Sequence, residues 1–149
     1  MSTPTSNSLQ GMVQRRRGVV AVITQHDRFL VIRRSQWVTA PRAFCFPGGG
    51  IEAGESEAEA ILRELDEELA ITQAEAVRRV WTSTTRRQVD LAWWLVRLPE
   101  MEIELRPNPD EVESYGWWHP ADIRANQEFL ESNQEFMQAW QTGEFDLLT

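Results

Sequence analysis

Three glutamates at helical spacing are the residues in this sequence best suited to chemistry. Glu64, Glu67 and Glu68 occupy positions i, i+3 and i+4, so in a helix their side chains share one face. Like charges at this spacing repel by about 0.2–0.5 kcal/mol per pair in an isolated helix. A hard divalent cation, whose preferred ligands are oxygens, would turn that repulsion into coordination. The spacing indicates a metal site, although such a pattern on its own is more typical of a solvated acidic face.

Two neighbouring features favour the metal site. A Pro-Gly-Gly-Gly run at residues 47–50 precedes the helix, and its glycines would let backbone carbonyls approach a ligand closely. Glu55 and Arg63 bracket the start of the helix. A solvated face needs neither feature.

The helix that carries the glutamates has recognisable ends and faces. Ser56 and Glu59 form an S-x-x-E capping box, which places the first helical residue near Glu57. An apolar stripe predicts the face that packs on a core, and its members are Leu62, Leu65 and Leu69, widened by Ile61 and Ala58. We expect the glutamates on the opposite face.

The stretch from Gly49 to Ile71 resembles the Nudix box, G-x5-E-x7-R-E-U-x-E-E-x-G-U, in which U is an aliphatic residue. The residues that fill it in register are Gly49, Glu55, Arg63, Glu64, Leu65, Glu67, Glu68 and Ile71. Ala70 departs from the pattern, because the family has a glycine there that supplies a left-handed helix cap. Alanine adopts that conformation at a cost of roughly 1 kcal/mol.

The resemblance implies a Nudix α/β/α sandwich, with a mixed and curved β-sheet between helices. It also implies hydrolysis of a diphosphate linkage in a nucleoside diphosphate joined to another moiety, with Mg²⁺ or Mn²⁺ as cofactor. The implied metal ligands are Glu64, Glu67 and Glu68, completed by the backbone carbonyl of Gly48 or Gly49. Arg63 would orient the box glutamates by pairing with Glu55. Oxygen ligands without His or Cys select Mg²⁺ or Mn²⁺ over zinc.

Many Nudix enzymes hold a further glutamate in a loop after the box, as a metal ligand or a general base. The Pro-rich acidic segment Arg106–Ser114 corresponds to this loop. Glu111 best matches the family's E-V-x4-W pattern, Glu113 is the alternative, and a solvated loop is as good an explanation as either. Either Glu67 or the loop glutamate would accept a proton from the attacking water.

Four residues are candidates for binding the substrate. In the MutT-like branch of the family an arginine at the position of Arg34 contacts the nucleotide, and Asn133 resembles an asparagine that reads the base. The aromatic residues Trp37 and Phe46 could stack on a base, although Trp37 could equally pack over the sheet. This set indicates a single nucleotide, and we expect a (d)NTP cleaved to the monophosphate and pyrophosphate.

The other elements follow from apolar periodicity and turn residues. The predicted strands are residues 18–24, 28–33, 44–46, 76–84, 88–98, 101–105 and 116–119, with hairpins joining the first two and the 76–84 and 88–98 pair. A helical turn is expected from Pro120, and a second capping box, Ser132 with Glu135, predicts a helix that Gly143 ends.

Composition narrows the classes of partner. The chain has 149 residues, a net charge of −8, 15 arginines and no lysine, so phosphate contacts would come from guanidinium groups. The acidity argues against binding to nucleic acid backbones. The single Cys45 and the absence of a long apolar run fit a cytoplasmic protein that spans no membrane. Residues 1–14 are expected to form a disordered tail and residues 15–149 a single domain, as a monomer or homodimer.

Two other functions remain as alternatives. An RNA 5′-end pyrophosphohydrolase would share the chemistry, but it would favour a basic groove. A ligand-sensing Nudix domain without catalysis would be expected to lose box carboxylates, whereas all of them are present.

Overall fold

Seven strands form one mixed sheet with helices on both of its faces. The computed structural model describes residues 16–148, and the predicted tail at residues 1–14 lies outside them. The strands are β1 (Arg16–Gln25), β2 (Arg28–Arg34), β3 (Phe44–Cys45), β4 (Gly48–Gly50), β5 (Glu75–Thr84), β6 (Val89–Arg97) and β7 (Val112–Trp118). The helices are α2 (Glu57–Leu69), α3 (Pro120–Ala125) and α4 (Glu131–Gln141). Within residues 16–148, no helix has both the length and the apolar character that a membrane span needs.

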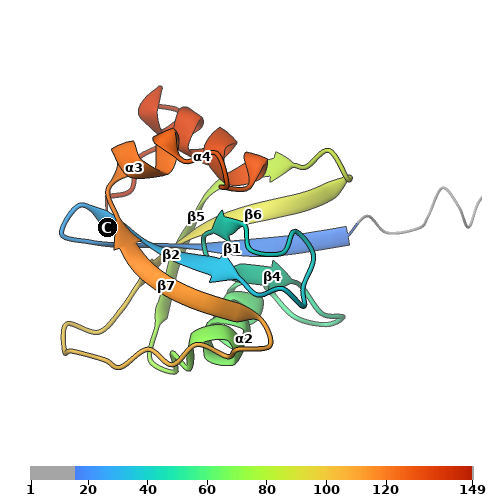
Figure 1. Cartoon of the computed structure of the whole chain (residues 1–149), viewed down its shortest axis with the longest axis vertical. Helices are drawn as coiled ribbons and strands as arrows, with labels where there is room; N and C mark the ends of the chain where they lie inside the picture. The colour runs from blue at the N-terminus through green and yellow to red at the C-terminus, as the bar shows by residue number, and fades with distance from the viewer. Residues whose placement is uncertain (1–15, 149) are drawn as a thin grey trace, which may run out of the picture.

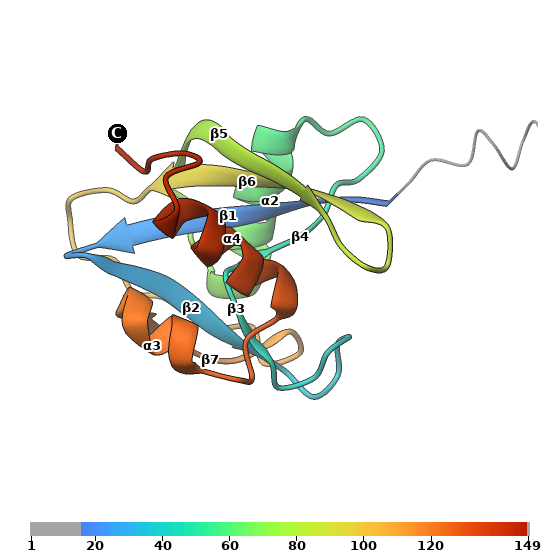
Figure 2. The same ribbon diagram turned by 90° about the horizontal axis from the view of Figure 1, so that it is seen from above.

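The sheet has the strand order β3-β2-β1-β6-β5, with β4 paired to β1 and β7 paired to β2. The β1 and β6 strands are parallel, whereas the other pairs are antiparallel, so the sheet is mixed. Helix α2 covers one face, and α3 and α4 cover the other (Figures 1 and 2). The predicted α/β/α sandwich is confirmed.

Alternation along β1 divides the core into two layers. Val19, Ala21 and Ile23 pack in a cluster with α2 residues, whereas Val20 and Val22 pack in a second cluster on the α4 side. Because successive strand residues point to opposite faces, an unbroken apolar run in β1 serves both layers. The α4 layer is rich in aromatic rings, which include Phe29, Phe46, Trp93, Phe129 and Phe136.

Both predicted hairpins are present, and each strand end differs from the prediction by at most two residues. The first turns at His26 and Asp27, whose φ angles of 52° and 62° are left-handed, as a two-residue hairpin turn requires. The helical turn from Pro120 is α3. The strand expected at 116–119 is longer and starts at Val112, immediately after Glu111.

Two predictions outside the box were wrong. The strand expected at residues 101–105 does not form. The segment instead runs to the end of α2, where the N–H of Arg106 donates to the carbonyl of Leu69 at 2.9 Å. Ser132 does not cap α4, which begins at Glu131 with Leu130 at its N-cap. The N–H of Leu130 donates to the carbonyl of Phe44, so contact with β3 determines where this helix begins.

Candidate active site

Helix α2 is fixed at both ends by its own sequence. Its N-terminus has the predicted capping box, because Ser56 Oγ accepts from the N–H of Glu59 at 3.1 Å and Glu59 Oε1 accepts from the N–H of Ser56 at 2.8 Å. Its C-cap is Ala70, which adopts the left-handed conformation (φ 57°, ψ 33°) that the family assigns to glycine. The register of the glutamates along the helix is therefore defined locally.

The two faces of α2 differ from the prediction. Leu62 is 40% exposed, whereas Glu64 and Glu68 are only 7% and 6% exposed. The residues of α2 with no exposed surface are Ala60, Ile61, Leu65 and Leu69. The expectation that all the glutamates lie on a face opposite the core was wrong, because β4 and the segment before β7 cover the side of the helix that carries Glu64 and Glu68.

The structure brings together three carboxylates from two elements. One carboxylate oxygen each of Glu64, Glu68 and Glu111 lies within 4.8 Å of the others. Of the two loop candidates, Glu111 joins this acidic cluster, whereas Glu113 pairs with Arg42 at 3.2 Å. Glu67 lies outside the cluster, with its side chain 47% exposed and 3.2 Å from Arg63.

The glycines of β4 let the backbone lie directly against this acidic cluster. The N–H of Gly48 donates to Glu68 Oε1 at 3.1 Å. A Cβ added to Gly49 would overlap the carboxylate of Glu64, so only glycine allows that carboxylate to occupy its place. The Pro-Gly-Gly-Gly run therefore gives the backbone close access to the glutamates.

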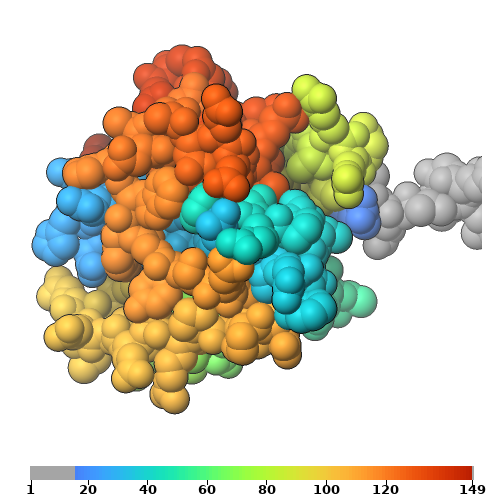
Figure 3. All heavy atoms as spheres, in the orientation of Figure 1, coloured from blue at the N-terminus to red at the C-terminus, as the bar shows by residue number. Residues whose placement is uncertain are grey.

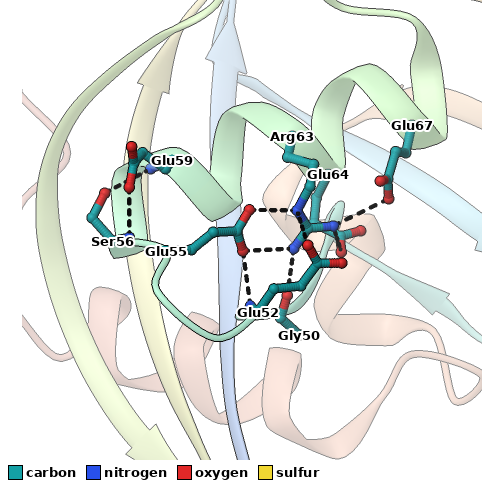
Figure 4. Close-up of polar contacts among 8 residues, drawn as sticks. All are labelled: Gly50, Glu52, Glu55, Ser56, Glu59, Arg63, Glu64 and Glu67. Carbon is teal, nitrogen blue, oxygen red and sulfur yellow. Dashed lines mark hydrogen bonds and ion pairs between the residues drawn. The ribbon is translucent and has the colours of Figure 1, made fainter.

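Arg63 organises the glutamates around the start of α2 (Figure 4). Its guanidinium group donates to both carboxylate oxygens of Glu55, to Glu64 Oε1 at 2.9 Å and to Glu67 Oε2 at 3.2 Å. It also donates to the carbonyl of Gly50 at 2.8 Å. The hydrogen bonds from Arg63, and then the N–H of Glu52, hold the pKa of the Glu55 carboxyl below its usual value. The pairing of Arg63 with Glu55 that the box implies is present.

Burial raises the pKa of two carboxyls in the acidic cluster. The pKa of Glu64 rises to about 7, mainly because the carboxyl is desolvated, while hydrogen bonding from Arg63 acts in the other direction. Desolvation also raises the pKa of Glu68 well above its usual value, and the neighbouring Glu64 adds to this effect. Buried negative charges so close together call for a cation, and oxygen donors alone fit a hard divalent one.

The four predicted substrate-binding residues differ in accessibility. Trp37 is 73% exposed on the loop after β2, whereas Phe46 and Asn133 are each 3% exposed. Asn133 Oδ1 accepts from the N–H of Phe46 at 2.8 Å, a bond that joins the start of β4 to α4. The half-buried Arg34 donates to the carbonyl and the hydroxyl of Thr39, so it shapes the loop that carries Trp37.

This loop lies beside Glu111 on one face of the molecule. In Figure 3 the cyan atoms after β2 adjoin the orange atoms around the start of β7. Ser35, which is 3% exposed, donates from Oγ to the carbonyl of Asp110 at 2.8 Å, and its N–H donates to the carbonyl of Glu111 at 3.0 Å. These contacts hold the start of the loop that carries Trp37 against the backbone of Asp110 and Glu111.

The family model of the NUDIX domain matches residues 14–140 of the sequence, which is most of the chain. This chain belongs to the Nudix domain family. In the structure, the Nudix box forms β4, the loop that follows it and α2. The protein is a Nudix hydrolase. Two members of its acidic cluster, Glu64 and Glu68, lie on the box helix, and the third, Glu111, lies just before β7.

Solved Nudix structures share the fold. A NUDIX hydrolase from Nitrosomonas europaea is 20% identical, with 91% of this chain and 97% of that chain covered and a TM-score of 0.70. A MutT protein from Methanosarcina mazei Go1 is 19% identical, with 87% and 94% covered and a TM-score of 0.69. An ADP-ribose pyrophosphatase from Streptococcus suis 89-1591 is 21% identical, with 83% and 90% covered and a TM-score of 0.65. A comparison with curated proteins finds no match.

Sequence reasoning missed two residues that support the site. Asn108 donates from Nδ2 to Glu111 Oε2 at 3.2 Å. Ser35 donates to the carbonyls of Asp110 and Glu111 and so fixes the backbone at that glutamate. The Asn-Pro-Asp sequence at 108–110 is typical of a turn, so the sequence predicts a turn there but not the hydrogen bond from Asn108 to Glu111. Ser35 has no such signal.

Proposed function

We propose that this Nudix hydrolase cleaves a diphosphate linkage in a single nucleotide, converting a (d)NTP to the monophosphate and pyrophosphate in a Mg²⁺-dependent reaction. The observation that carries the proposal is the acidic cluster of Glu64, Glu68 and Glu111, in which three carboxylates come within 4.8 Å of one another. Glu64 and Glu68 are buried, and desolvation is the main cause of their raised pKa values, so a nearby cation would stabilise their charged forms.

The ligand set for Mg²⁺ or Mn²⁺ in this proposal is the acidic cluster, with Glu67 next to it. The backbone carbonyl of Gly48 is a further candidate. The N–H and C=O of one strand residue point to the same side of the strand, and the Gly48 N–H points to Glu68. Gly49 contributes by leaving room for the Glu64 carboxylate. All of these donors are oxygens, which a hard cation prefers to nitrogen or sulfur ligands.

A bound divalent cation would neutralise phosphate oxygens and lower the pKa of an attacking water. The protein's own residues have the remaining tasks. Arg63 keeps Glu64 and Glu67 in fixed orientations through its contacts of 2.9 and 3.2 Å. The carboxylate of Glu111 or of Glu67 accepts the proton of the water. Glu111 lies in the acidic cluster, whereas Glu67 lies at its solvent side and is held by Arg63.

For the nucleotide, the proposal relies on the two accessible candidates. Trp37 offers an exposed indole on which a base can stack, and Arg34, at the end of β2, places its guanidinium group against Thr39 of the same loop. Phe46 and Asn133 are buried against each other, so in this conformation they support the sheet beneath that loop rather than offering surface to a base.

Cleavage of a capped or triphosphorylated RNA end is the alternative reaction. The net charge of −8 counts against it, because an RNA chain brings many additional negative charges. A nucleoside diphosphate linked to a sugar is a second alternative, because the structurally similar protein from Streptococcus suis is named an ADP-ribose pyrophosphatase. We also propose a cytoplasmic location, which the free and buried thiol of Cys45 supports.

A substrate panel tests the proposal. The protein is assayed with Mg²⁺ against canonical and 8-oxo-dNTPs, ADP-ribose, NADH, dinucleoside polyphosphates and capped RNA, and the products show which bond is cut. We expect (d)NTP cleavage that stops in excess EDTA and returns with Mg²⁺ or Mn²⁺. Cleavage of capped RNA with no action on free nucleotides would contradict the substrate, and undiminished turnover in excess chelator would contradict the metal.

A further inference from the structure

Asn108 lies where the segment before β7 meets the end of α2. Its N–H donates to the carbonyl of Glu68 at 2.9 Å, and the N–H of Arg106 donates to the carbonyl of Leu69 at 2.9 Å. The last four carbonyls of a helix have no partner within the helix, so these two bonds complete the final turn of α2. The segment is thereby docked on the turn that carries Glu68.

The remaining polar atoms of Asn108 contact Glu111 and its neighbours. Nδ2 donates to Glu111 Oε2 at 3.2 Å, and the carbonyl of Asn108 accepts from the N–H of Glu111 at 2.9 Å. Oδ1 accepts from the N–H of Asp110 at 3.1 Å, which closes a local turn. Asn108 therefore touches two of the three members of the acidic cluster.

We propose that Asn108 is a positioning residue that holds the carboxylate of Glu111 toward Glu64 and Glu68, in the arrangement that binds a divalent cation. The inference rests on the proposed function, because it requires Glu111 to be a metal ligand. Groups that hydrogen-bond to a metal ligand orient it and strongly affect metal affinity. The side-chain amide suits this task, since a carboxylate has about four lone-pair sites and the amide occupies only one. As a neutral group, the amide also adds no positive charge that would repel the cation.

The competing explanation is that Asn108 only shapes the turn. Asn108→Ser separates the two roles, because a serine hydroxyl can still accept from the N–H of Asp110 but is too short to reach Glu111. Mn²⁺ binding to the substrate-free protein is measured by electron paramagnetic resonance for five proteins: the unaltered chain, N108S, E111Q, the N108S/E111Q double variant and E68Q. Melting temperatures in EDTA for the same proteins report on folding.

We expect N108S to weaken Mn²⁺ binding by about 10-fold, as for other residues that hydrogen-bond to metal ligands. In the E111Q background the same change should alter binding by less than about twofold, because an effect transmitted through Glu111 disappears with its carboxylate. The melting temperature of N108S in EDTA should stay close to that of the unaltered chain, because the local turn is retained.

Other results would overturn the inference. An equal loss in both backgrounds would show that Asn108 acts through the backbone turn, and undiminished binding by N108S would show that it does not act on the metal site. If E111Q binds Mn²⁺ normally while E68Q does not, the inference fails although the proposed metal site stands. If the unaltered chain binds no Mn²⁺, the proposed function fails together with the inference.

Discussion

The carboxylate of Glu64 lies against the backbone of Gly49, in the space that a side chain on that residue would occupy. Strand β4 and helix α2 therefore approach so closely at the acidic cluster that the strand has room there only for the hydrogen of a glycine. This relationship explains in physical terms why the box places a glycine before its glutamates.

Gly49→Ala should displace Glu64 and impair metal binding. We expect turnover with Mg²⁺ to fall at least about 10-fold, in line with losses seen when metal ligands are misplaced. The melting temperature in EDTA should change little, because the group that must move is the far end of a side chain. Gly50→Ala is the matched control, since a Cβ there meets nothing within 4 Å. Equal turnover of the two variants would contradict the role of Gly49.

Glu68→Gln should separate catalysis from folding. The substitution removes a buried negative charge and retains an oxygen that can accept from the N–H of Gly48, so the metal-free protein should be as stable as before or slightly more stable. The rate with Mg²⁺ should fall by at least about 10²-fold, because metal stabilisation of the transition state contributes several kcal/mol.

Leu65→Ala is the converse variant. Leu65 is fully buried in the α2 layer, so its truncation should lower the free energy of unfolding by roughly 2–5 kcal/mol while the metal ligands remain. Melting temperature without metal and turnover with Mg²⁺ are measured on both variants. Near-normal turnover of Glu68→Gln would remove this glutamate from the catalytic site.

Stability of the metal-free protein should fall as pH rises. The folded-state pKa of Glu64 is raised from its usual 4.5 to about 7, so the native state binds the proton more tightly than the unfolded chain does. The stabilisation that comes from the protonated Glu64 is fully present below pH 4.5 and is lost as pH rises through about 7. Melting temperatures in EDTA across this range should decline less for Glu64→Gln, and equal slopes would contradict the prediction.

Trp37→Ala should weaken nucleotide binding without affecting folding. The indole is 73% exposed, so its removal leaves the core intact. Stacking between a base and an aromatic ring contributes about 1–3 kcal/mol, and KM should rise accordingly while Trp37→Phe retains most of the affinity. Met101→Ala, which truncates another exposed apolar residue (63%), is the control. An unchanged KM in Trp37→Ala would exclude stacking.

Features of the fold that depend on nearby residues were predictable from the sequence. The capping box of α2 and the hairpin turn at His26 and Asp27 involve residues at most a few positions apart. Their hydrogen bonds form within one turn, so the local sequence contains the information that specifies them.

Features that depend on distant contacts were not predictable. The pattern Ser132-x-x-Glu135 is a correct capping signature, but pairing of Leu130 with Phe44 starts α4 earlier. Glu111 was preferred over Glu113 only through the family pattern, and its contact with the acidic cluster depends on where the segment after β6 crosses the end of α2. Glu64 and Glu68 are buried because β4 and that same segment cover the helix. The spacing of residues within α2 does not predict this cover, because it comes from other parts of the chain.

The parallel pairing of β1 with β6 also determines when the chain can fold during synthesis. Arg16 is paired with Val89 and Ile23 with Val96. One edge of β1 therefore stays unpaired until residues 89–96 have been synthesised. Contacts between distant segments form late, because a long loop must close before they contribute. Until β6 has left the ribosome, the apolar β1 strand keeps an unpaired edge that other nascent chains could occupy. Molecular chaperones that shield such edges should therefore matter most for this protein before its second hairpin is complete.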